Sequence, residues 1–194
     1  MQTRKLNATL AVVLLTVLSL WPAQIFAQKV VNVVTAGTLP TLYAGNDAEL
    51  KLTGSINGTD AKYLRRLIND GALTALDLSE VKIVSGGEAY YDNLKTEDDV
   101  LGESMFSECG NLRSVVLPAS ITAIGKAAFS RTGLREIDIP SNVYRVGYDA
   151  FAYCSSLNKV VIGSRVATLE QGVFYSSAVR QAYVKRLTPP AISN

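Results

Sequence analysis

Two carboxylates, Glu136 and Asp138, stand two positions apart in a short segment in which apolar and polar residues alternate. In a β-strand such positions point to the same side, about 6.6 Å apart along the chain. Paired carboxylates at this kind of separation are the catalytic groups of glycosidases. The chain contains no histidine, so Ser-His and Cys-His nucleophiles and imidazole metal ligands are excluded. The absence of histidine does not exclude an enzyme that uses carboxylates.

More acidic residues lie between residues 84 and 103, together with Tyr90 and Tyr91. The carboxylates are Glu88, Asp92, Glu97, Asp98, Asp99 and Glu103. They lack the regular spacing and the glycine of known calcium loops, so we predict no metal site and no cofactor. Two interpretations stay open for this segment: a solvated acidic loop, or a loop in which the tyrosines contact a ligand.

The elements that position these groups repeat along the chain. Four phenylalanines follow one another at intervals of 23, 22 and 23 residues: Phe106, Phe129, Phe151 and Phe174. Aligned on them, the segments beginning at Leu112, Leu134, Leu157 and Val179 share the pattern L-x-x-V-x-L, or close variants of it. Internal repeats of 20 to 50 residues are typical of solenoids. The pattern extends upstream to Leu73-x-x-Leu76-x-Leu78 and, more loosely, to Leu50-Lys51-Leu52.

Each repeat predicts one coil of a solenoid. The segment L-x-x-V-x-L alternates like a half-buried strand, and Pro118, Pro140 or Gly163 ends it. A second apolar pair then turns inward before the phenylalanine closes the coil. A single coil cannot bury its own apolar side, so coils must stack. We therefore predict an α/β-type solenoid of leucine-rich repeats of 22–23 residues, with a parallel β-sheet on the concave face and an N-terminal α+β cap.

Cys109 and Cys154 are the only cysteines, and each follows a repeat phenylalanine by three residues. They thus occupy equivalent places two coils apart, with Thr132 in the coil between them. Stacked coils rise about 4.8 Å each, which separates the pair by about 10 Å. A disulfide requires Cα atoms closer than about 7 Å. We predict two free, buried cysteines.

The chain divides into three regions. Residues 28–72 are expected to form the N-terminal cap and a first repeat-like unit, with a strand at 30–34, a short helix at 39–43 and a helix capped by Asp60 and ending near Asn69. Residues 73–194 are expected to hold the repeats, interrupted by an acidic loop at 84–103. The last repeat begins at Val184-Lys185 and stops at Asn194 without a closing Ala-Phe, so we expect it to be incomplete.

Residues 1–27 have the features of a secretory signal peptide. Arg4 and Lys5 precede an uncharged, largely apolar run of 13 residues, and Ala27 fits a cleavage site. This run is shorter than the 20 or so residues that span a bilayer, which favours a cleaved signal peptide over a membrane anchor. After its removal we expect no membrane span. The remaining chain has 17 basic and 17 acidic residues, which gives no support for nucleic-acid binding. We predict an exported protein that is secreted, periplasmic or on the cell surface.

When its repeats are aligned, the sequence resembles the BspA-like leucine-rich repeat family of bacterial secreted and surface proteins. The resemblance rests on the pattern L-x-x-V-x-L-P-x-x-I-x-x-I-G-x-x-A-F-x-x-C-x-x-L, read from Leu112 to Phe129 and again from Leu134 to Cys154. It covers residues 101–187 strongly. It implies an extracellular binding protein, often displayed on the surface, and it names no ligand.

Strand alternation predicts which side chains face solvent. One outward column is Lys51, Asp77, Val116, Asp138, Val161 and Tyr183, and its neighbour is Glu49, Ala75, Ser114, Glu136, Lys159 and Gln181. Apolar residues on such a face indicate a protein-binding strip, although β-branched residues also favour strands in general. We predict as ligand contacts Val116, Glu136, Asp138, Lys159, Val161, Gln181 and Tyr183, with Tyr90 and Tyr91. A further column of Arg113, Arg135 and Arg180 either favours acidic partners or is a solvated rim.

Three hypotheses follow. The first is a non-enzymatic binding or adhesion module that recognises an extracellular protein or glycan through the concave face. The second is a structural spacer or assembly unit of a cell-surface layer, joined edge to edge at the C-terminal end of the solenoid. The third is the carboxylate enzyme, which we do not expect because an open repeat face offers no deep pocket.

Overall fold

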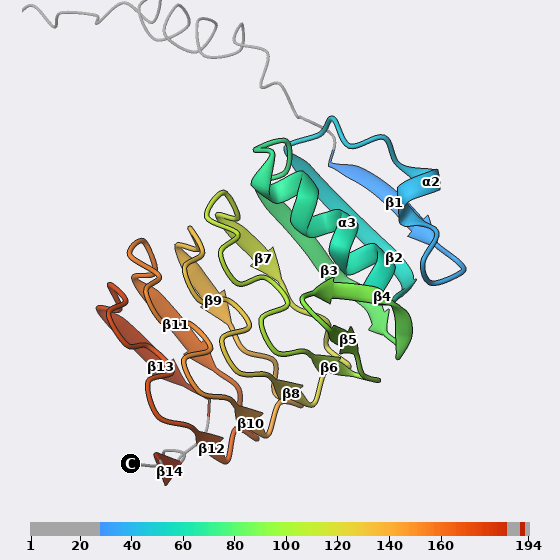
Figure 1. The fold of residues 1–194 in the computed structure, drawn as a ribbon. Coiled ribbons are helices and arrows are strands. Elements are labelled where there is room, and N and C mark those ends of the chain that lie inside the picture. Colours follow the sequence, from blue (N-terminus) through green and yellow to red (C-terminus); the bar gives the residue numbers. More distant parts are fainter. Residues whose placement is uncertain (1–27, 186–190, 193–194) are drawn as a thin grey trace, which may run out of the picture.

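The fold is a stack of coils that carries strands on two sides (Figure 1). The computed structural model describes residues 28–185 and 191–192. The predicted signal peptide at 1–27, and most of the predicted last repeat after Lys185, lie outside these residues. No helix among the described residues is long and apolar enough to cross a membrane.

The longer strands form one side, which we call the front face. The first four make one parallel sheet: β1 (Lys29–Val33), β2 (Glu49–Ile56), β3 (Ala75–Ile83) and β7 (Ser114–Val116). A second parallel sheet contains β9 (Glu136–Asp138), β11 (Lys159–Ile162) and β13 (Gln181–Val184). These strands confirm the predicted repeat segments. The front face is not one continuous sheet, however, because β7 and β9 belong to different ladders.

Two-residue strands form the opposite side of the stack. In spatial order they are β6 (Val100–Leu101), β8 (Ala123–Ile124), β10 (Arg145–Val146), β12 (Thr168–Leu169) and β14 (Ala191–Ile192). All four pairings between them are parallel. The protein is therefore a repeat protein with several parallel sheets, as a solenoid requires.

The repeat phenylalanines stack on one another along the core. Their ring centroids lie 5.6 Å apart for Phe106 and Phe129, 5.3 Å for Phe129 and Phe151, and 5.7 Å for Phe151 and Phe174. The interplanar angles are 16°, 5° and 17°, so the rings are nearly parallel. Phe106, Phe129 and Phe151 are completely buried. Each coil thus contributes one ring to a column that joins neighbouring coils.

Both cysteines are free and buried. Thr132 lies between their coils, and its Oγ1 is 3.2 Å from Sγ of Cys154. Burial is the main cause that raises the pKa of Cys109 to about 11. Burial also raises the pKa of Cys154, opposed by hydrogen bonding to Thr132. Neither thiol is poised to react as a thiolate at neutral pH.

Two helices lie at the N-terminal end. The short α2 (Leu39–Leu42) and the longer α3 (Gly58–Asn69) agree with the helices predicted there. The predicted cap is wrong, because α3 begins one turn earlier and is capped by Asn57. Asp60 is fully buried and its carboxylate accepts hydrogen bonds from the backbone N–H groups of Gly37, Leu39 and Asn57. It therefore ties the start of α2 to the start of α3.

The segment predicted as an acidic loop is mostly ordered into strands. It contains an antiparallel hairpin of β4 (Gly86–Tyr91) and β5 (Leu94–Thr96), followed by β6 of the back sheet. The hairpin packs beside α3, where the carbonyl oxygen of Glu88 would clash with any side chain at Gly58. One of its acidic residues, Glu88, pairs with Lys62 on α3 at 2.6 Å, and both side chains stay more than half exposed.

Candidate functional site

The outward columns of the front face are arranged as predicted. Register pairs Lys159 with Glu136 on one side and with Gln181 on the other. In the next column Val161 lies between Asp138 and Tyr183. The inward residues of the same strands, Ile137 and Val160, are buried at 2% and 0% exposure. Alternation alone therefore places the predicted contacts of β9, β11 and β13 on one surface.

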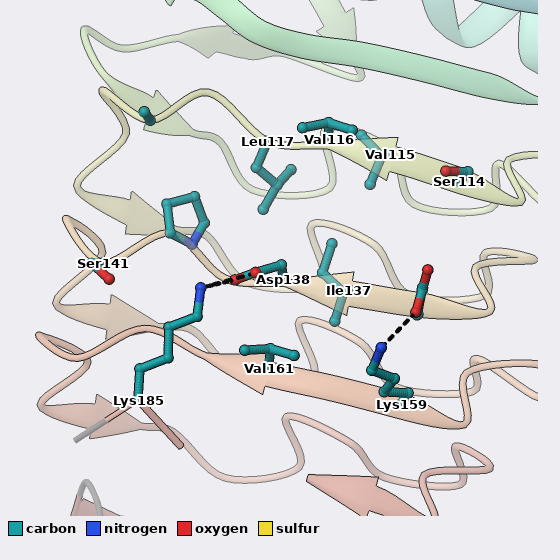
Figure 2. A pocket seen from close by; sticks show the side chains of 13 residues that line it. Ser114, Val115, Val116, Leu117, Ile137, Asp138, Ser141, Lys159, Val161 and Lys185 are labelled. Carbon is teal, nitrogen blue, oxygen red and sulfur yellow. Dashed lines mark hydrogen bonds and ion pairs between the residues drawn. The ribbon is translucent and has the colours of Figure 1, made fainter. Parts of the chain in front are cut away.

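A groove follows the interruption between β7 and β9. The two strands share no ladder, although the backbone N–H of Arg135 donates to the carbonyl oxygen of Arg113 at 3.3 Å just before they begin. The groove has a volume of about 550 Å³. Its lining includes five predicted contacts, which are Val116, Glu136, Asp138, Lys159 and Val161. Figure 2 shows Val116 and Val161 on either side of β9.

Ion pairs flank the groove. The Nζ of Lys159 is 3.2 Å from Oε2 of Glu136 in the neighbouring strand. At the other end, Nζ of Lys185 is 2.9 Å from both carboxylate oxygens of Asp138 (Figure 2). Both carboxylates are thus already neutralised by a lysine. Lys185 was not among the predicted contacts, because it lies beyond β13 where the repeat pattern gives no side-chain direction.

The remaining predicted contacts divide into two groups. Gln181 and Tyr183 are exposed on β13, beside the groove but not in its lining. Tyr90 is only 4% exposed, and its hydroxyl donates to the carbonyl oxygen of Glu103 at 2.8 Å. Tyr91 is half-buried under the guanidinium group of Arg65, 4.6 Å from its ring centroid. The hairpin turns these tyrosines toward the body of the protein, which leaves Tyr90 little exposed surface for the predicted ligand contact.

Comparison with known proteins identifies the family of this chain. Residues 91–188 match the family described as the BspA type leucine rich repeat region, with six copies. The chain belongs to this family. The resemblance drawn from the phenylalanine-anchored pattern is thereby confirmed. The comparison with curated proteins gave no match.

Two solved structures resemble this BspA type chain. A leucine-rich repeat protein from Bacteroides ovatus is 19% identical, with a TM-score of 0.36 over 79% of this chain and 45% of that one. A leucine rich cell surface protein from Faecalibacterium prausnitzii is 16% identical, with a TM-score of 0.34 over 80% of this chain and 64% of that one. The chain spans less than two thirds of the length of either protein.

The front face of this BspA type protein combines paired charges with exposed apolar side chains. Its two carboxylates are exposed and held by lysines, with side-chain exposures of 67% for Glu136 and 59% for Asp138. Over residues 28–185 no three histidine, cysteine or acidic side chains come together as a metal-binding group. What the groove offers is an apolar surface between charged groups that already have partners.

Proposed function

We propose that this chain is an exported, non-enzymatic binding module that recognises an extracellular protein or glycan through its front face. The observation that carries the proposal is the exposure of apolar side chains beside the groove. Val116 is 48% exposed although its neighbour Val115 in the same strand is buried, and Tyr183 is 52% exposed. Apolar and aromatic side chains at the centre of a polar surface are the usual anchors of a protein contact.

The ion pairs support the same function. Burying an unpaired charge under a ligand is costly, whereas Glu136 and Asp138 keep lysine partners when the surface is covered. The paired charges also disfavour a glycosidase, because a general acid or base must be free to exchange a proton with the substrate. A face built this way binds without a chemical step.

A binding experiment tests the proposal on an array of extracellular matrix proteins and glycans. The double variant Val116→Asp with Tyr183→Ala should lose binding to whichever spots the unaltered protein recognises. The matched control is Leu42→Asp with Tyr144→Ala, because both of these side chains are 53% exposed and lie outside the groove. Unchanged binding by the front-face variant, or turnover of a glycoside on the array, would contradict the proposal.

Export belongs to the same proposal and has its own test. N-terminal sequencing of the protein recovered from the cell envelope or the medium should begin at Gln28, after removal of residues 1–27. An Ala27→Leu variant should be processed poorly, because the cleavage site needs a small residue there. A protein recovered only from the cytoplasm with its first residues intact would contradict export.

A second candidate function is assembly with further copies, and one observation favours it. All four residues of β13 are exposed, although Ala182 and Val184 pair in register with Val160 and Ile162, which are buried in β11. An exposed strand with apolar inward positions is a template for a neighbouring chain. Light scattering over a concentration series tests this, with Val184→Lys as the disrupting variant. A protein that stays monomeric at every concentration would contradict assembly.

A further inference from the structure

A row of arginines runs beside the groove. Arg113 and Arg135 each follow the first apolar residue of a repeat segment. Arg180 holds the same place two coils after Arg135, and Asn158 holds it in the coil between them. All three arginines are exposed. Among residues 28–185, none of the three guanidinium groups has an ion-pair or hydrogen-bond partner. This contrasts with Lys159 and Lys185 on the same face, which are both paired.

Two smaller hollows contain the arginines, and one of them shares residues with the groove. One, of about 430 Å³, is lined by Arg113 and Arg135 and shares Ser114 and Glu136 with the groove lining. Another, of about 350 Å³, contains Arg180 with Gln181 and Asn158. The apolar strip of Val116, Val161 and Tyr183 and the arginine row are therefore parts of one surface.

The charge of this surface is positive on balance. The three hollows are lined by five cationic side chains and three carboxylates, of which Glu49 and Glu136 lie nearest to the arginines. Glu136 is occupied by Lys159, which leaves the arginines to interact outward. Guanidinium groups favour carboxylates because two N–H groups match the two oxygens. The row therefore attracts an anionic partner.

The spacing between the arginine row and the apolar strip indicates what kind of anionic partner covers both. Arg113 and Val116 are three residues apart, about 10 Å along the strand. Neighbouring coils repeat each row every 4.8 Å or so. A partner that covers both rows must present carboxylates along one edge and apolar side chains along the other. A protein segment does this, whereas an acidic glycan carries no apolar side chains.

We infer that the front face binds an acidic protein segment whose carboxylates meet Arg113, Arg135 and Arg180 while its apolar side chains enter the groove. This inference rests on the proposed binding function and specifies its partner. Charge steering by the unpaired arginines brings the segment in, and the Val116 and Tyr183 contacts retain it.

The test uses the full chain and an array of synthetic peptides in which acidic, basic and apolar positions are varied independently, with heparin as a non-protein polyanion. Peptides that carry both acidic and apolar residues should bind at least tenfold more tightly than their basic or purely acidic counterparts. The affinity should fall as salt is raised. Arg135→Glu should weaken binding about tenfold, and Arg113→Glu with Arg180→Glu should weaken it further.

The control is Arg165→Glu, which makes the same change of charge at an exposed arginine outside the three hollows. It should leave the affinity unchanged. Equal weakening by Arg165→Glu, preference for basic peptides, tighter binding of heparin, or no peptide binding would overturn the inference. If Val116→Asp with Tyr183→Ala abolishes binding to an array protein while Arg135→Glu has no effect, the binding function stands and the acidic partner does not.

Discussion

The ammonium group of Lys185 lies 2.9 Å from both carboxylate oxygens of Asp138, although 47 residues separate them in the chain. Asp138 ends β9 and Lys185 follows β13, so the side chain of Lys185 extends past β11 to reach its partner. The contact joins coils that are not neighbours. It also fixes one end of the groove, where Figure 2 shows the pair between Ser141 and Val161.

This ion pair should contribute little to stability. The side chains of Lys185 and Asp138 are 45% and 59% exposed, and exposed pairs contribute about 0–1 kcal/mol. A double-mutant cycle of Lys185→Met and Asp138→Asn, measured by urea denaturation, should give a coupling free energy below about 1 kcal/mol that shrinks at high salt. A coupling above about 2 kcal/mol that ignores salt would show that the pair holds the coils together.

The stacked phenylalanines should contribute far more. Phe129 is fully buried between the rings of Phe106 and Phe151. Phe129→Ala leaves a cavity between two coils and should lower the free energy of unfolding by about 3–5 kcal/mol. Phe129→Leu fills part of that space and should cost less, while the exposed control Tyr144→Ala should stay within about 0.5 kcal/mol. Denaturation midpoints that do not differ between Phe129→Ala and Tyr144→Ala would contradict a structural role for the stack.

The repeating part of the fold and of the site was predictable from the sequence because every coil solves the same packing problem. The phenylalanine in each repeat predicted that the coils close and stack, and the stacked rings follow from that arrangement. Strand alternation predicted that Val161 stands between Asp138 and Tyr183. The N-terminal strands and helices were predictable for a related reason, since their apolar residues recur with the period of each element.

The non-repeating contacts could not be predicted in the same way. The direction of Tyr90 depends on a hairpin that packs against α3, and this packing in turn requires the absence of a side chain at Gly58. The start of α3 was misplaced because Asp60 fits the pattern of a cap. In the structure its carboxylate accepts hydrogen bonds from the backbone N–H groups of Gly37 and Leu39 at the start of α2 and of Asn57, the residue that caps α3. Lys185 was missed since its contact with Asp138 crosses a whole coil.

Both thiols should be unreactive in the folded protein. A thiol reagent at pH 8 is expected to modify neither Cys109 nor Cys154 until the chain is unfolded, and then to modify both, as counted by mass spectrometry. If both cysteines react only after reduction as well as unfolding, they form a disulfide instead.

The raised thiol pKa also predicts how stability depends on pH. Cys109 has a pKa of about 11 in the folded protein against an ordinary value of 9.0, so folding favours the neutral thiol. Its contribution is fully present below pH 9 and is lost as the pH rises through 11. Denaturation midpoints of the unaltered protein should fall over this range more steeply than those of Cys109→Ala. Parallel curves for the two proteins would contradict this assignment.

The coils should become more stable when a strained residue is replaced by glycine. Ala127 has a φ of 51°, in the left-handed region, as do Ser104 and Asp149 at the equivalent places, and Gly172 fills this place in the next coil with a φ of 72°. The left-handed conformation costs an L-residue about 1–2 kcal/mol, which exceeds the extra entropy that glycine loses on folding. Ala127→Gly should therefore raise the free energy of unfolding by about 0.5–1 kcal/mol. Ala167→Gly is the control, because Ala167 is exposed and outside the left-handed region, and it should lower that free energy by a similar amount. If both substitutions destabilise the protein equally in urea denaturation, the left-handed turn carries no strain that glycine relieves.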